Sequence, residues 1–176
     1  MAKIRSIITL GHPLLRQTAQ LVADFGGHQQ LLIDDLLATV EQAGGVGIAA
    51  PQVAIVDQLM IVASRPHPRY PTAPMMTPVA MFNPRLVSHA PEVDYGWEGC
   101  LSVPGARGWV PRYRTIIGEF VDRQGQRQTW PMTDFIARIF QHELDHLQGI
   151  LFIDRIERHQ DLISEQDYQA RVAAAT

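Results

Sequence analysis

The feature that most constrains the fold is a helical pattern in the last third of the chain that carries two histidines and a glutamate. Apolar side chains recur at helical spacing after Thr133 or Asp134, either of which is a suitable N-cap, and Gly149 is placed to end the helix. Side chains four positions apart share one face of a helix, so His142 and His146 point to one spot. A helix of this kind must be largely buried, and the rest of the chain must cover it.

Two neutral imidazoles at this spacing can bind one divalent cation, and Glu143 can take a proton from a water at that cation. The same H-E-x-x-H pattern also occurs by chance in helices, as a solvated or core-packed stripe. The apolar neighbours favour the metal site, because buried imidazoles and carboxylates need partners. These neighbours are Phe135, Ile136, Ile139, Phe140, Leu144 and Leu147.

Length and composition predict one globular domain. The 176 residues are 46% hydrophobic and 19% charged, which is enough to bury a core, and we expect a single catalytic domain over 1–176. A net charge of −3 gives no sign of a specific nucleic-acid partner or of a membrane surface. No apolar run approaches the ~20 residues that span a bilayer, and no secretory signal is evident at the start. The single cysteine, Cys100, precludes an intrachain disulfide, so we expect the protein to be cytoplasmic.

Short strands interrupted by helices predict the α+β class, with antiparallel and mixed β-sheets wrapped around the central helix. An N-terminal helix and a C-terminal helical tail complete the expected fold. The predicted elements are a short strand or extended entry at 4–10, a helix at 28–43 ended by Gly44-Gly45, a buried strand at 58–63, an irregular proline-rich loop at 65–78, a strand with a turn or bulge at 79–88, a β-hairpin of 113–121 and 126–132, a short apolar segment at 150–153 and a helical tail at 157–176.

A catalytic site of this type needs a third protein ligand, and three positions come into question. The residue six positions after the second histidine is Phe152, which cannot bind a metal. Glu165 lies about where a downstream carboxylate would be, but its polar surroundings favour a solvated side chain. Cys100 is the remaining candidate: a lone cysteine is commonly a small buried residue, yet Glu98 and Gly99 beside it favour a thiolate ligand.

Three separated motifs, GVGIAAPQ at 45–52, EGCLS at 98–102 and QHELDH at 141–146, closely resemble the peptide deformylase family in order and spacing. Segments 11–16, 103–107 and 110–112 extend the resemblance, which covers roughly residues 4 to 155. The chain departs from compact bacterial members in its longer loop at 65–78 and in its tail.

The resemblance implies hydrolysis of the formyl group from the formylmethionine that starts nascent peptides. It implies that Cys100, His142 and His146 hold the metal and that Glu143 transfers the proton. The family is generally regarded as using Fe2+ and as accepting Zn2+, Ni2+ or Co2+. Family correspondence also assigns the donors to the developing oxyanion, namely the side-chain amide of Gln52 and the backbone N–H of Leu101.

Gly45 and Gly47 would leave main-chain groups exposed along an edge, so that a peptide can add as a further strand, although Gly45 can also simply cap the preceding helix. Gly99 would permit a close backbone approach. By resemblance, the walls of the methionine pocket are Val46, Phe135 and Arg138, of which Phe135 could equally belong to the core.

Three further residues are expected to support the ligands. Asp145 lies off the direction that the two histidines share in projection, so it should orient or pack the helix and bind no metal. Glu98 is expected to pair with Arg112 and so to fix the cysteine loop.

Two other functions compete with this interpretation. One is a zinc endopeptidase with His142, His146 and Glu165 as ligands; the other is a binding module in which Cys100 and the two histidines form a closed structural site. Nascent formyl-Met peptides are the expected partners under the favoured interpretation, together with a transient contact with the ribosome.

Overall fold

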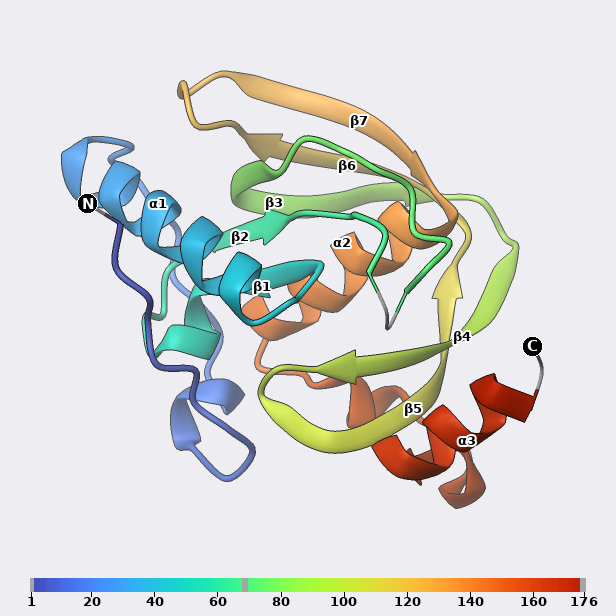
Figure 1. Cartoon of the computed structure of the whole chain (residues 1–176). Helices are drawn as coiled ribbons and strands as arrows, with labels where there is room; N and C mark the ends of the chain where they lie inside the picture. The colour runs from blue at the N-terminus through green and yellow to red at the C-terminus, as the bar shows by residue number, and fades with distance from the viewer. Residues whose placement is uncertain (1, 68–69, 175–176) are drawn as a thin grey trace.

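The computed structural model describes residues 2–67 and 70–174 (Figure 1). Its helices and strands, in chain order, are α1 (Gly27–Gln42), β1 (Gly47–Ala49), β2 (Leu59–Val62), β3 (Val79–His89), β4 (Val93–Cys100), β5 (Val103–Tyr113), β6 (Thr115–Val121), β7 (Arg127–Thr133), α2 (Asp134–Leu147), β8 (Leu162–Ser164) and α3 (Glu165–Ala174). Short 3-10 turns are η1 (Pro13–Arg16), η2 (Ala50–Val53), η3 (Phe152–Arg155) and η4 (His159–Asp161).

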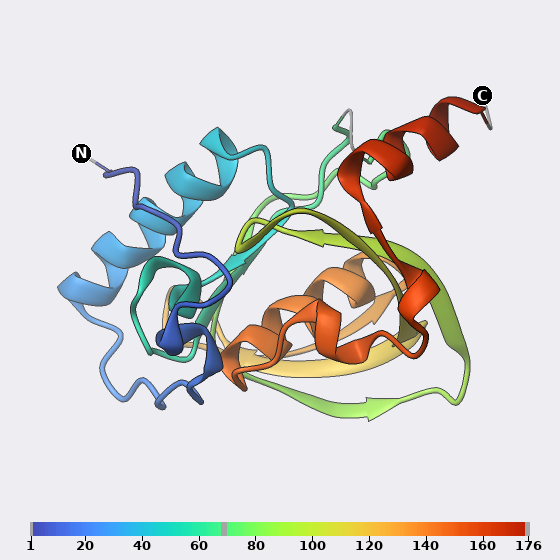
Figure 2. The same ribbon diagram turned by 90° about the horizontal axis from the view of Figure 1, so that it is seen from below.

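Two sheets enclose α2, which Figure 2 shows lying inside the curved strands. The larger sheet has the order β1-β2-β3-β6-β7 and the smaller has the order β4-β5-β8. Every pair of neighbouring strands in the two sheets is antiparallel. The α+β class and the central position of the H-E-x-x-H helix are therefore confirmed, with antiparallel pairing throughout both sheets.

Strand β2 explains why one short segment can be apolar at every position. Leu59 and Ile61 belong to the apolar cluster beneath α1, whereas Met60 and Val62 belong to the cluster around α2. Successive side chains of a strand point to opposite faces, so a strand between two helices needs apolar residues on both. The large sheet thus carries α1 on one face and α2 on the other.

The two ends of helix α2 are fixed by different features. Thr133 occupies the N-cap position, but its side chain makes no capping hydrogen bond. The helix ends where Gly149 has a φ of 73°, and a Cβ there would lie 2.6 Å from the carbonyl oxygen of Arg16. Glycine is required at this point by both conformation and space.

The β6–β7 hairpin confirms the prediction for residues 113–132, with one shift: Tyr113 ends β5 and the hairpin starts at Thr115. The preceding β4–β5 hairpin was not predicted, because glycine and proline disfavour strands. Here the glycines make room for large partners. A Cβ on Gly96 would lie 2.8 Å from Arg138, and one on Gly108 would lie 2.8 Å from Phe152.

The two ends of the chain fare differently. Residues 4–10 take the second of the two expected forms, an extended entry without a strand, in which Ile8 donates its N–H to the Gln52 carbonyl at 2.9 Å. The tail is helical only over α3, because 162–164 form β8 and pair with β5. Positions 68 and 69 of the predicted loop, and 175 and 176 of the predicted tail, lie outside the described residues. No helix in the described part is long and apolar enough to cross a membrane.

Candidate active site

Three of the predicted ligands come together although they lie far apart in sequence. Cys100 ends β4, and the two histidines lie one turn apart on α2. The donor atoms of Cys100, His142 and His146 all lie within 4.8 Å of one another, and the cysteine Sγ is 3.1 Å from His146 Nε2. Thiolate and imidazole are ligands that suit zinc and other late divalent metals. The donor set therefore fits one cation.

The ring of His142 is oriented by a carboxylate. Its Nδ1 lies 2.9 Å from Oε2 of Glu98, which leaves Nε2 for the cation, as in many carboxylate–histidine–metal arrangements. Burial alone would raise the pKa of Glu98, but Arg112 and His142 hold that pKa well below its usual range. An ionised Glu98 therefore faces His142 throughout the neutral range.

The two histidines differ in their affinity for protons. Burial lowers the pKa of His142, but hydrogen bonds to Cys100 and Glu98 outweigh it and hold the pKa well above its ordinary value. Burial, followed by repulsion from His142, lowers the pKa of His146 well below that value. A cation bound at this group would displace the proton of His142, so metal binding should release protons.

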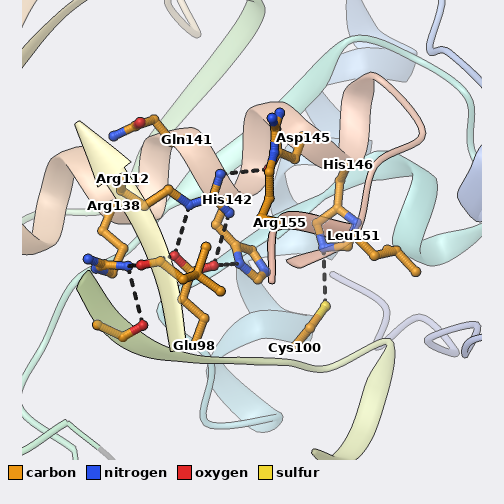
Figure 3. A network of polar contacts seen from close by, with 12 residues as sticks. Glu98, Cys100, Arg112, Arg138, Gln141, His142, Asp145, His146, Leu151 and Arg155 are labelled. Atoms are coloured by element: carbon orange, nitrogen blue, oxygen red, sulfur yellow. Dashed lines mark hydrogen bonds and ion pairs between the residues drawn. The ribbon is translucent and has the colours of Figure 1, made fainter. Parts of the chain in front are cut away.

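The expected Glu98–Arg112 pair is present and buried (Figure 3). Nε and Nη2 of Arg112 each donate to a Glu98 oxygen at 2.9 Å, and Nη1 donates to Asp145 Oδ2 at 2.6 Å. Asp145 also accepts from Arg155 and is absent from the ligand group. It thus lies where a helix-orienting role requires it.

Glu143 lies beside the ligands, in space that the absence of a side chain at Gly47 leaves open. It is 4% exposed, and its Oε2 has no hydrogen-bond partner in the described part of the chain. Burial raises the pKa of Glu143 to about 7. A Cβ on Gly47 would lie 2.5 Å from Glu143 Oε1, so this glycine is needed for space as well as for an exposed main chain.

The amide of Gln52 is held in one orientation. Its Oε1 accepts the N–H of Ala49 at 2.9 Å, which turns Nε2 toward Ser102 Oγ at 3.2 Å and Cys100 Sγ at 3.5 Å. An amide fixed in this way presents a donor beside the ligand cysteine. Leu101, the next residue, lines the same cleft.

One open cleft connects these groups, and it encloses about 570 Å³ including open solvent. The predicted site residues that line it are Gly45, Val46, Gly47, Gln52, Glu98, Gly99, Cys100, Leu101, Phe135, Arg138, His142 and Glu143. His146, Arg112 and Asp145 lie behind these walls. Phe135 both lines the cleft and packs against the core around α2, so the two expectations for it are compatible.

Sequence reasoning missed two aromatic walls, Tyr70 and Trp97. Tyr70 belongs to the proline-rich loop, where no periodicity marks it; its ring lies 5.1 Å from that of Phe135. Trp97 precedes Glu98 on β4, a strand that the sequence did not predict.

The ligand set of the rival endopeptidase is not assembled. Glu165 accepts hydrogen bonds from Nε and Nη2 of Arg107 at 2.6 and 3.2 Å, and it does not belong to the one metal-binding group found among the described residues. Glu165 is 36% exposed, in line with the expected surface carboxylate, but it also forms an ion pair with the buried Arg107, which was not expected.

Comparison with known proteins gives consistent matches. The family model for polypeptide deformylase matches residues 4–161. The chain is 57% identical to peptide deformylase 2 of a Nostoc species over 171 residues, covering 97% of this chain and 96% of the relative. It is 44% identical to peptide deformylase 2 of Shewanella oneidensis, covering 92% and 89%.

Solved structures agree in fold. A class I type b peptide deformylase from Acinetobacter baumannii with bound Met-Ala-Ser superimposes with a TM-score of 0.87 at 42% identity, covering 89% of this chain and 100% of that one. A peptide deformylase from Synechococcus elongatus in complex with actinonin gives a TM-score of 0.80 at 32% identity, covering 92% and 86%.

Proposed function

The chain belongs to the peptide deformylase family, and from this premise we propose how its own residues carry out the reaction. It is a hydrolase that removes the N-formyl group from the N-terminal formylmethionine of nascent polypeptides, with release of formate. The observation that carries the assignment of residues is the convergence of one thiol and two imidazoles, within 4.8 Å, at the wall of an open cleft.

We propose that Cys100, His142 and His146 hold one divalent cation, which is natively Fe2+ and can be replaced by Zn2+, Ni2+ or Co2+. Three protein ligands leave a fourth position open, as a catalytic site needs. When bound, the cation lowers the pKa of a water and polarises the formyl carbonyl. Affinity alone favours later metals over Fe2+, so supply in the cell has to select iron.

Glu143 is proposed to take the proton from the attacking water and to return it to the leaving amine. A general base works best when its pKa lies near the operating pH, and burial raises the pKa of this carboxyl to about 7. The orphaned Oε2 supports the same role, since a buried oxygen without a partner has a free position for a water proton.

The oxygen of the formyl group gains negative charge during attack, and we propose that two donors stabilise it. They are the side-chain amide of Gln52 and the backbone N–H of Leu101. The bond from Ala49 to Gln52 Oε1 supports this, because a donor that is already oriented costs no reorganisation in the transition state.

The peptide is proposed to bind as an added strand between the Gly45–Gly47 segment and Gly99, with the methionine side chain against Val46, Phe135 and Arg138. All of these residues line the cleft, which supports the assignment. Main-chain hydrogen bonds would then give affinity for any sequence, and the pocket would select the first side chain.

Deformylation of formyl-Met-Ala-Ser after anaerobic reconstitution with Fe2+, Ni2+ or Zn2+ tests this proposal. We expect turnover that requires added cation. E143Q should keep its fold and its cation but lose at least about 10²-fold in kcat, whereas E92Q, at an exposed position, should behave as the wild type.

Wild-type turnover by E143Q would remove Glu143 from the mechanism. Tight metal binding without turnover in any reconstituted form would instead support the closed structural site. The Fe2+ enzyme should lose activity faster under air than under argon, because oxygen oxidises the iron or Cys100. Equal loss of activity under the two gases would count against iron.

Three wider proposals follow. Residues 1–176 act as one catalytic domain, which is supported because the ligands come from β4 and α2 and the tail pairs with β5. The compartment is the cytoplasm, where nascent chains emerge and a thiolate stays reduced. The protein contacts the ribosome transiently. Co-sedimentation with ribosomes, compared between the full chain and a variant truncated after Asp161, would test whether the tail contributes to this contact.

A further inference from the structure

We propose that Arg155 is a positioning residue for the metal site, although it contacts neither a ligand nor the substrate cleft. It acts by holding Asp145 and Arg112 so that Glu98 keeps the His142 ring in the orientation that binds the cation. This inference rests on the metal site proposed above.

An unbroken series of ion pairs connects Arg155 to the ring of His142, and dashed lines in Figure 3 mark part of it. Arg155 donates from Nη2 to Asp145 Oδ1 at 2.7 Å and from Nε to Oδ2 at 3.1 Å. Asp145 Oδ2 accepts from Arg112 at 2.6 Å, Arg112 binds both oxygens of Glu98, and Glu98 Oε2 meets His142 Nδ1 at 2.9 Å. Charges alternate along the series, which we call the buried ion-pair series.

The members of the series differ sharply in exposure. The side chains of Glu98, Arg112 and Asp145 are 4–6% exposed, whereas that of Arg155 is 42% exposed. Buried charges depend on their partners, because removing one partner leaves the other charge desolvated and uncompensated. Arg155 is thus the point at which the series reaches solvent.

Arg155 donates two of the three hydrogen bonds that the Asp145 carboxylate accepts from arginines, and Arg112 donates the third. Without Arg155, Asp145 Oδ1 would lose the donor that the structure provides, and the carboxylate would keep one guanidinium, which it shares with Glu98. Arg112 would then be drawn toward Asp145. Glu98 also accepts a hydrogen bond from Arg138 Nη1 at 2.9 Å, but that bond is to Oε1, whereas His142 meets Oε2. A shift of Arg112 changes the two hydrogen bonds that it donates to Glu98, and with them the placement of the His142 ring.

Arg155 and Asp145 line a second cavity, on another face of α2, together with Gln141 and Gln148. None of the residues lining this cavity also lines the substrate cleft. Replacing Arg155 therefore leaves the cleft walls intact, and an effect on the metal would have to travel through the series.

The test compares R155M with R158M. Arg158 makes an equivalent two-bond pair with Asp161, and among the described residues no ion pair joins Arg158 or Asp161 to α2. Zn2+ affinity is measured by competition with a chelator, and KM is measured with formyl-Met-Ala-Ser. We expect R155M to bind Zn2+ about three- to tenfold more weakly, below the 10–100-fold typical of direct partners of a ligand, while R158M stays within about twofold.

A double-mutant cycle with E98Q identifies the route. If Arg155 acts through Glu98, R155M should weaken Zn2+ binding much less in the E98Q background than in the wild type, and R155K should restore part of the affinity. KM should stay within about twofold. R155Q and R158Q replace the methionine variants if R155M does not fold.

Wild-type Zn2+ affinity in R155M, or equal losses in the two backgrounds, would overturn the proposal, as would equal losses in R155M and R158M. C100S separates this result from the metal site itself. If C100S loses Zn2+ but R155M does not, only the role of Arg155 fails; if C100S keeps full affinity, the ligand assignment fails.

Discussion

Two buried arginines on β5 organise different regions of the enzyme. Arg112 joins Glu98 of β4 to Asp145 of α2, so that its partners lie within the segments that carry the ligands. Arg107 joins Tyr70 of the proline-rich loop to Glu165 of α3, and its guanidinium lies 4.6 Å from the centre of the Tyr168 ring. The comparison teaches that the chemistry is braced from within the motifs, whereas the rim of the cleft is braced by segments outside them.

The largest expected effect is the loss of Arg112. R112M should lower the free energy of unfolding by about 3–5 kcal/mol and should weaken metal binding by more than about 100-fold, because it strands two buried carboxylates. R114M, which breaks an exposed pair with Asp134, is the control and should cost at most about 1 kcal/mol. Urea unfolding and metal content measure both. A metal-replete R112M would break the comparison.

R107M comes next. It should cost about 2–3 kcal/mol, because its partner Glu165 is 36% exposed and can be rehydrated. Metal affinity should not change, but KM for formyl-Met-Ala-Ser should rise a few-fold, since Tyr70 loses its hydrogen bond and shifts as a cleft wall. Loss of metal in R107M would show that the two regions are not separable.

In the metal-free protein, acid should reduce the stability that the Glu98–Arg112 pair contributes. The pKa of Glu98 is lowered in the folded state, so its contribution to stability is present above its ordinary pKa and is lost as the pH falls below it. The difference in unfolding free energy between wild type and E98Q should therefore narrow, by about 1–2 kcal/mol, between pH 6 and pH 3. A constant difference would contradict the assignment.

The smallest effect is expected for E165Q. The amide keeps an oxygen that can accept one of the two hydrogen bonds from the buried Arg107, and position 165 is 36% exposed, so the lost charge should cost about 0.5–1 kcal/mol and leave the metal content unchanged. Thermal unfolding and metal analysis of E165Q and the nearby D167N would check this. Loss of the metal in E165Q alone would revive the endopeptidase.

Sequence reasoning found what local pattern encodes. Helical spacing identified α1 and α2, and turn residues identified the β6–β7 hairpin. The neighbours of Cys100 and the family resemblance of the motifs predicted that its thiol lies beside the two histidines. The β4–β5 hairpin was not predicted because its glycines make room for Arg138 and Phe152, which are distant in sequence.

The supporting residues escaped for a similar reason. Arg107 and Glu165 are 58 positions apart, and nothing near either of them in the sequence announces the pair. Arg155 follows an apolar segment and looks like a surface charge until its carboxylate partner on α2 is known.

The close approach of Gly47 to Glu143 also matters for drug resistance. Any side chain at position 47 would displace the carboxylate of Glu143, the proposed general base, since even a Cβ would lie 2.5 Å from its oxygen. A competitive inhibitor whose affinity depends on contact with this glycine would be hard to evade by substitution at position 47, because each substitution would also shift the carboxylate that we propose as the general base.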